Sequence, residues 1–350
     1  MEINSHQQLT CQVDSLDLPN LPKATMVWLT DEQRGVRLAV LPAAGGEMGS
    51  LQVRIAGCWV DILHRGLEYS DWPREAGDGR ASLLWPIVGR SFTDEQITEW
   101  ERTGVQPVQN RYRMEGEIFD IDIHGFVWRL PWQLKGYGQT KDAANATCQL
   151  KSSTDTLKMY PFDFELSATY RIEGGDIVLD YQVAAGDNAR PMPFSIGNHL
   201  ALRIPFTKPG RFSECTLRTP GHVILHQNAL CLLSGESTQV NLSNPTPLGQ
   251  RELLDTVLGG FRRDGARLEL NAPGSMALCI KHCEKAGNGK LLASDEDYFF
   301  VFWGDPVMGY FCPEPWIGKP NSLNTGEGCL YLPPGKRFDW EIRITPTIIV

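Results

Sequence analysis

The sequence lacks the features that mark membrane proteins and nucleic-acid-binding proteins. No apolar run approaches the length of a membrane-spanning helix, and the polar start at residues 1–6 is unlike a secretory signal. There is no excess of basic residues, because 33 lysines and arginines face 42 acidic residues and give a formal net charge of −9. We therefore expect a cytoplasmic protein with no membrane partner and no nucleic-acid partner.

The cysteines lack the spacing of a disulfide framework or of a zinc site. There are nine, an odd number scattered along the chain, which is typical of reduced cytosolic thiols. Cys279 and Cys283 flank His282, but this segment alternates as a strand does and no second ligand pair follows. We predict no metal site.

Internal repeats are absent, and helix-like stretches are few. Only residues 93–103 and 251–258 are predicted as short helices. Glycine (34) and proline (23) are plentiful, which is typical of many short strands joined by turns. We predict an all-β fold, a large antiparallel β-sandwich with few short helices, built as a single domain over residues 1–350. Residues 1–24 are expected to be a lead-in segment or an edge element, and residues 25–350 the domain proper.

Three segments carry the clearest strand patterns. Residues 162–183 alternate apolar and polar side chains on both sides of Gly174-Gly175, which predicts a long antiparallel hairpin with one buried face. Residues 298–303 are uniformly apolar, which predicts a central strand covered on both sides. Residues 117–126 also alternate, and the pattern places His124 on the polar face of that strand.

Two titratable side chains stand in apolar surroundings. His199 follows Gly197-Asn198 in the apolar segment 191–206, where a histidine is either a hydrogen-bonded core residue or a positioned acid or base. Glu314 lies between two prolines, where it is either a turn carboxylate or a functional group held beside a core strand.

Several short motifs follow one another in a characteristic order. They are Gly89-Arg90, His124-Gly125-Phe126 with a trailing Pro131-Trp132, the hairpin that begins at Pro161-Phe162, Pro193-Phe194-Ser195-Ile196-Gly197-Asn198-His199, and Glu314-Pro315-Trp316. In this order the sequence resembles the aldose 1-epimerase (mutarotase) superfamily, from about residue 34 to the C-terminus. The resemblance implies the galactose mutarotase-like β-sandwich.

The resemblance also implies an activity, the reversible opening of a sugar ring that interconverts the α and β anomers of an aldohexose. Carried over to this sequence, Glu314 is the general base that takes the proton of the anomeric hydroxyl. His199 is the general acid that protonates the ring oxygen, and His124 is the second catalytic histidine. One base and one acid acting on two oxygens of the same carbon must converge on one face.

The motifs indicate the substrate-binding residues less strongly than the catalytic residues. The expected substrate-binding residues are Arg90, Asp255, Trp316 and Trp132. Arg90 is alternatively a surface ion-pair partner. Trp85 and Trp128 are further candidates for stacking on a sugar, although most of the ten tryptophans are expected in the core.

The resemblance implies a small-molecule sugar as the partner and no cofactor. The identity of the sugar and the oligomeric state stay open, because Leu200-Ala201-Leu202 follows His199 where dedicated galactose mutarotases have Tyr-Phe-Asn.

Three other functions compete with this interpretation. A hexose-6-phosphate 1-epimerase of the same fold needs extra cations, for which Arg90, Arg129 and Arg203 are available. A non-catalytic carbohydrate-binding protein is disfavoured because both histidines and the glutamate are present. A glycosidase needs two carboxylates across the scissile bond and is disfavoured because the motifs pair one carboxylate with histidines.

Overall fold

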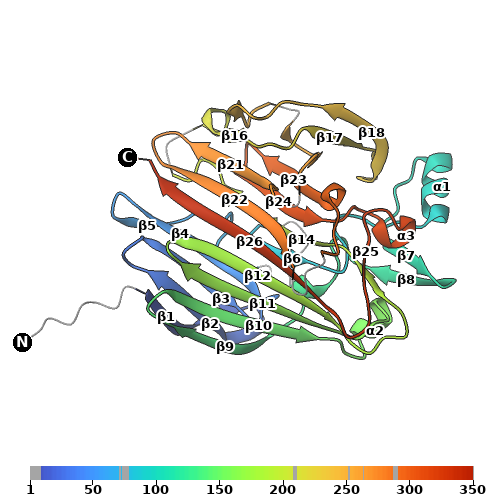
Figure 1. The fold of residues 1–350 in the computed structure, drawn as a ribbon, viewed down its shortest axis with the longest axis horizontal. Coiled ribbons are helices and arrows are strands. Elements are labelled where there is room, and N and C mark those ends of the chain that lie inside the picture. The colour runs from blue at the N-terminus through green and yellow to red at the C-terminus, as the bar shows by residue number, and fades with distance from the viewer. Residues whose placement is uncertain are drawn as a thin grey trace, which may run out of the picture.

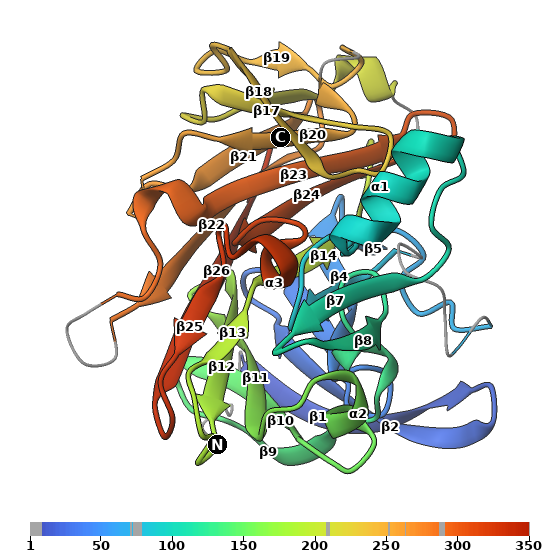
Figure 2. The same cartoon turned by 90° about the vertical axis from the view of Figure 1, so that its right-hand side faces the viewer.

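The computed structural model describes residues 9–70, 72, 79–207, 211–250, 253–262, 264–286 and 291–349, and most of the strands in these ranges form two large antiparallel sheets (Figures 1 and 2). The larger sheet has thirteen strands within these ranges. Its main path is β1 (Leu9–Leu18), β2 (Leu21–Asp31), β3 (Val36–Leu41), β4 (Glu47–Ile55), β6 (Ala81–Leu84), β14 (Ile196–Leu200), β24 (Tyr310–Ile317), β23 (Tyr298–Asp305), β20 (Thr256–Gly259), β17 (Val223–Gln227) and β18 (Leu233–Gln239). Off this path, β5 (Cys58–Asp61) pairs with β4, and β15 (Leu202–Arg203) pairs with β24.

The second large sheet has nine strands in the described ranges and packs against the first (Figure 1). Its order is β19 (Thr246–Pro247), β16 (Thr216–Arg218), β21 (Arg267–Ala272), β22 (Met276–Lys285), β26 (Arg337–Ile348), β12 (Asp176–Ala185), β11 (Phe164–Glu173), β10 (Ala143–Lys151) and β9 (Gln133–Gln139). Two small sheets pair β13 (Met192–Phe194) with β25 (Leu330–Leu332), and β7 (Asn110–Met114) with β8 (Glu117–Ile121). The predicted all-β sandwich is confirmed.

The described helices are short. They are α1 (Asp94–Thr103), α2 (Thr156–Met159), α3 (Ser322–Thr325) and the 3₁₀ turns Val127–Arg129, Phe212–Glu214 and Asp295–Asp297. In the part of the chain that the structure describes, no helix has the length and apolar character needed to cross a bilayer. The predicted helix at 93–103 is confirmed as α1, which begins after Thr93 in a capping box and ends at Gly104.

The prediction of a second helix over residues 251–258 is wrong for the part of this segment that the structure describes. Arg251 and Glu252 lie outside the described residues, and Thr256–Gly259 is strand β20, between β17 and β23. All four residues of β20 are buried. A short strand covered on both faces has the same continuous apolar pattern as a buried helix, so periodicity could not separate the two.

The predicted hairpin is confirmed in register. β11 and β12 pair from Phe164↔Ala185 to Glu173↔Asp176, and side chains of β11 alternate strictly between buried and half-buried. The described part of the predicted lead-in segment is an edge element, since β1 is the outermost strand beside β2. The extent of a single domain stays a prediction, although one hydrophobic cluster draws residues from both large sheets.

Strand β23 separates the shared core from a second apolar cluster on the other face of its sheet. Phe300 and Phe302 belong to the shared core, whereas Phe299 and Val301 pack with Trp316 on the opposite face. The predicted central strand is thus confirmed as far as Phe302. Trp303 differs, because its side chain is 45% exposed on the face of the sheet that carries the second cluster.

The alternation predicted that His124 lies on a strand, but the structure places it in a turn. β8 ends at Ile121, and His124 and Gly125 follow in a turn with φ of 64° and 76°. The backbone N–H of His124 donates to the Gly89 carbonyl, 2.9 Å away, and Gly125 bridges to Trp85. The turn therefore fastens His124 to the loop that follows β6.

We predict that Gly125→Ala lowers the free energy of unfolding by about 1–3 kcal/mol or more. A Cβ at this position would lie 2.0 Å from the Trp85 carbonyl oxygen, in a backbone conformation that alanine disfavours. Gly116→Ala is the matched control, because Gly116 also has positive φ but open space around it. Urea denaturation of both variants tests this contact, and equal losses of stability would contradict it.

Candidate active site

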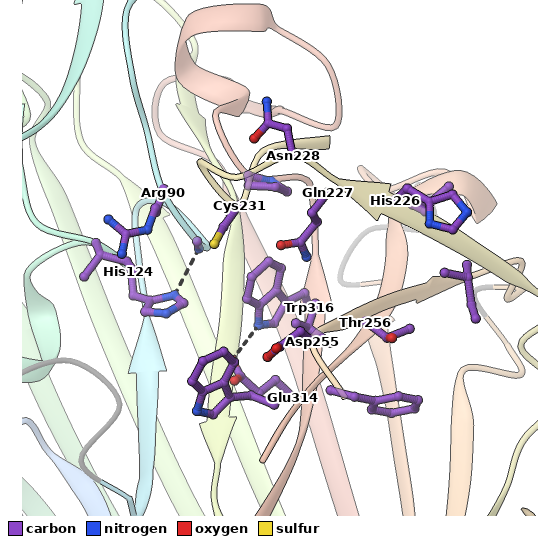
Figure 3. A pocket seen from close by; sticks show the side chains of 18 of the residues that line it. Arg90, His124, His226, Gln227, Asn228, Cys231, Asp255, Thr256, Glu314 and Trp316 are labelled. Atoms are coloured by element: carbon purple, nitrogen blue, oxygen red, sulfur yellow. Dashed lines mark hydrogen bonds between the residues drawn. The ribbon is translucent and has the colours of Figure 1, made fainter. Parts of the chain in front are cut away.

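A large cavity opens on the face of the larger sheet that is turned away from the shared core (Figure 3). Its volume is about 1110 Å³. Six of the seven predicted site residues line it: Arg90, His124, His199, Asp255, Glu314 and Trp316. Residues from distant parts of the sequence are therefore brought together as the resemblance implied.

Glu314 owes its position to the alternation of β24. Cys312, Glu314 and Trp316 share one face of this strand, and the Glu314 side chain is buried, with 2% of its surface exposed. The Trp316 Nε1–H donates to Glu314 Oε2 at 3.1 Å (Figure 3). Burial raises the pKa of Glu314 to about 8, and the hydrogen bond from Trp316 opposes this rise.

His199 reaches Glu314 from the neighbouring strand. β14 pairs with β24 through Gly197↔Trp316, and His199 Nε2 lies 3.3 Å from Glu314 Oε1. Gly197 permits this approach, because a Cβ there would stand 2.6 Å from the Trp316 indole. The pair is thus held by close packing of two strands and one indole ring.

His124 is fixed as a hydrogen-bond donor. The Gly89 backbone N–H donates to His124 Nδ1 at 3.0 Å, so Nδ1 is unprotonated and the proton of the neutral ring resides on Nε2 (Figure 3). Burial lowers the pKa of His124 well below its usual value, and His199 and Arg90 lower it further. His124 is therefore a neutral imidazole whose free Nε2–H can donate to a ligand.

Arg90 contributes a positive charge at the edge of the cavity. Its backbone carbonyl accepts a hydrogen bond from the Asn321 N–H at 2.9 Å, which ties this loop to α3. Within the described residues, the Arg90 guanidinium has no carboxylate partner, so the alternative role as a surface ion-pair partner is not supported.

Asp255 and Trp132 differ in what the structure shows. Asp255 lines the cavity just before β20, with a φ of 53° that is uncommon for aspartate, and burial raises its pKa.

Trp132 does not reach the cavity. It is buried in the shared core, where its Nε1–H donates to the Val127 carbonyl at 3.0 Å. Its prediction as a sugar-binding residue is not supported, because both its ring and its polar atom are already occupied by the fold.

Trp85 and Trp128, the other stacking candidates, are also buried and do not line the cavity. Residues that sequence reasoning missed take their place, among them Gln227 and Asn228 at the end of β17, and Trp303 on β23. Gln227 and Asn228 stand in a segment with no chemical motif. Trp303 ends an apolar run just before Gly304, and only its exposed ring identifies it.

One group of side chains in the described residues has the donors and spacing to hold a metal ion. The donor atoms of His199, Cys312 and Glu314 lie within 4.8 Å of one another. The sequence-based candidate, Cys279 with His282 and Cys283, forms no such group: His282 is buried in the core beside Trp340, while the two half-buried cysteines occupy the other face of β22.

Comparisons with known proteins identify relatives of this chain. The family model for aldose 1-epimerase matches residues 111–345. The chain is 25% identical over 268 residues to the chromosomal protein LacX of Lactococcus lactis, an alignment that covers 75% of this chain and 81% of LacX. It is 21% identical over 237 residues to human galactose mutarotase, covering 63% of this chain and 68% of that protein.

A solved structure shows the same fold. The galactose mutarotase-like protein of Clostridium acetobutylicum superposes with a TM-score of 0.76 at 15% identity, over 98% of this chain and 100% of that one. The family match spans residues 111–345, which is most of the chain. This chain belongs to the aldose 1-epimerase family and is a carbohydrate epimerase, an isomerase.

Proposed function

We propose that this epimerase interconverts the α and β anomers of an unphosphorylated aldohexose. The observation that carries the proposal is the buried pair of His199 Nε2 and Glu314 Oε1, 3.3 Å apart at the wall of the cavity. A hexose placed with its anomeric carbon against this pair presents two oxygens, the anomeric hydroxyl and the ring oxygen. One needs a base and the other an acid.

In this proposal, the Glu314 carboxylate takes the proton of the anomeric hydroxyl, and protonated His199 gives its proton to the ring oxygen. The bond between the anomeric carbon and the ring oxygen breaks, and an open-chain aldehyde forms. Rotation about the adjacent carbon–carbon bond and return of both protons close the ring as the other anomer. Glu314 gains one proton and His199 loses one when the ring opens, and both changes are reversed when it closes. The cycle therefore consumes no external acid or base.

His124 supports the same step without carrying a charge. Its Nε2–H can donate to the ring oxygen or to a neighbouring hydroxyl, and the Gly89 N–H holds the ring in that tautomer. Arg90 and Asp255 offer a donor and an acceptor for the remaining hydroxyls, and Trp316 offers an apolar surface in the cavity wall.

Phosphorylated hexoses are the second candidate, and the arginines disfavour them. Arg129 is engaged by Asp122, with the Arg129 Nη1–Asp122 Oδ2 distance at 3.2 Å, and its guanidinium lies over the Trp128 ring. Arg203 does not line the cavity, so Arg90 is the one of the three expected arginines that does. A single arginine favours recognition of hydroxyls over a doubly charged phosphate.

The first experiment is anomer exchange at equilibrium, followed by magnetisation-transfer NMR on glucose, galactose and glucose 6-phosphate in parallel. We expect acceleration on at least one free hexose. Acceleration confined to glucose 6-phosphate would replace the proposal by a phosphate-sugar epimerase, and binding without acceleration on any of the three would favour a binding protein.

Glu314→Gln removes the proposed base and keeps the size of the side chain. We expect the exchange rate to fall by ~10²–10⁴-fold while the sugar still binds. Glu327→Gln, at an exposed position, is the control and should exchange at the wild-type rate. A Glu314→Gln variant with near-wild-type exchange would rule out Glu314 as the base.

The raised pKa of Glu314 predicts the pH dependence. Because the proposed step needs an ionised Glu314 and a protonated His199, kcat/KM should follow a bell-shaped pH profile, and the limb set by Glu314 should lie near pH 8, well above the range of an ordinary carboxyl. Trp316→Phe removes the hydrogen bond that lowers this pKa, so the limb set by Glu314 should move to still higher pH.

Trp303→Phe is the matched control for that shift. Trp303 lines the same cavity, but the indole that donates a hydrogen bond to Glu314 is that of Trp316. In Trp303→Phe, the limb set by Glu314 should stay at the wild-type position. If both variants shift the profile equally, the hydrogen bond from Trp316 does not set the pKa of Glu314.

A further inference from the structure

A thiol lies directly beside the acid–base pair, and the epimerase reaction does not use it. Cys312 stands two residues before Glu314 on β24, on the same face of the strand, with none of its surface exposed. His199 and Glu314 are 6% and 2% exposed. The three donor atoms, one sulfur, one nitrogen and one oxygen, lie within 4.8 Å of one another.

The spacing of these donors suits a small tetrahedral cation. Zn²⁺ binds sulfur at about 2.3 Å and nitrogen or oxygen at about 2.0–2.2 Å, so the donors of a tetrahedral shell lie about 3.5 Å apart. The nitrogen and oxygen already stand 3.3 Å apart. The sulfur lies within 4.8 Å of both, so the donors need to approach by at most about 1.3 Å to reach that spacing.

The charges also favour a divalent ion. A Zn²⁺ ion held by a thiolate, a carboxylate and a neutral imidazole forms a complex with no net charge, which removes the main penalty for burying an ion. The donor set of sulfur and imidazole nitrogen excludes Mg²⁺ and Ca²⁺, which require oxygen ligands. His199 and Glu314 line the cavity, so a solvent ion can reach the group and a fourth position remains for water.

We propose that His199, Cys312 and Glu314 form a binding site for Zn²⁺ that switches the enzyme off. Each bound ion displaces the thiol proton and takes the lone pairs of the imidazole nitrogen and the carboxylate. These are the lone pairs that the sugar protons need. Zn²⁺ is therefore an inhibitor competing for the catalytic pair and not a cofactor. The inhibition rests on the proposed function, whereas the binding of the ion does not.

Co²⁺ is the probe for the site, because a cobalt–thiolate bond produces a charge-transfer absorption in the near ultraviolet that no other side chain gives. We expect the wild-type protein to show this band on titration with Co²⁺ and to lose it when Zn²⁺ is added in excess. Cys312→Ala should lack the band and bind Zn²⁺ at least ~10–100-fold more weakly by calorimetry. Cys231→Ser is the matched control, because Cys231 is an exposed thiol that lines the same cavity, and it should keep the band.

Inhibition is measured separately, as the fraction of each variant's own metal-free anomer exchange that remains in Zn²⁺. Wild type and Cys231→Ser should lose their exchange and regain it with a chelator, and Cys312→Ala should resist. A cobalt band that survives in Cys312→Ala, or that disappears in Cys231→Ser, overturns the site. If Cys312 gives the band but Zn²⁺ does not inhibit exchange, the proposed inhibition is wrong and the proposed metal site is retained. If no variant exchanges any sugar, the proposed function fails, while the cobalt band still decides the metal site.

Discussion

The pairing of β14 with β24 is the contact on which the site depends. It joins a strand from the middle of the sequence to one near its end, and it places His199 and Glu314 on adjacent strands with their side chains on one face. Every other group is arranged around this pair. The turn at His124 is fastened to Gly89, and the loop after Gly89 is fastened to Asn321, so the second histidine and Arg90 are positioned relative to the same two strands.

Burial determines the protonation behaviour of Glu314 and His124. The same desolvation that raises the pKa of Glu314 lowers that of His124, so one side chain becomes a stronger base and the other a neutral donor. A carboxylate in this position has little water to screen it. Its charge is stabilised by the hydrogen bond that the Trp316 indole donates.

The fold and much of the site could be predicted because they depend on local patterns. The β11–β12 hairpin follows from strict alternation, and the catalytic candidates follow from short motifs that keep their order. The errors arose where long-range contacts decide. β20 is a strand because two neighbours flank it, Trp132 is a core residue because the cluster shared by the two large sheets encloses it, and the backbone at His124 turns because Gly89 and Trp85 hold it. None of these partners is adjacent in sequence, so no pattern could reveal them.

The alternation of β24 has a consequence for how this protein can change in length. Because Cys312, Glu314 and Trp316 share one face, the insertion or deletion of a single residue inside the strand would exchange the two faces. It would turn Phe311 and Pro313 outward and drive the carboxylate into the core. The turn after Asp305, where Val307 and Met308 are exposed, carries no such constraint. Variation in length is thus expected to accumulate in that turn, while the eight residues of Tyr310–Ile317 keep a fixed count.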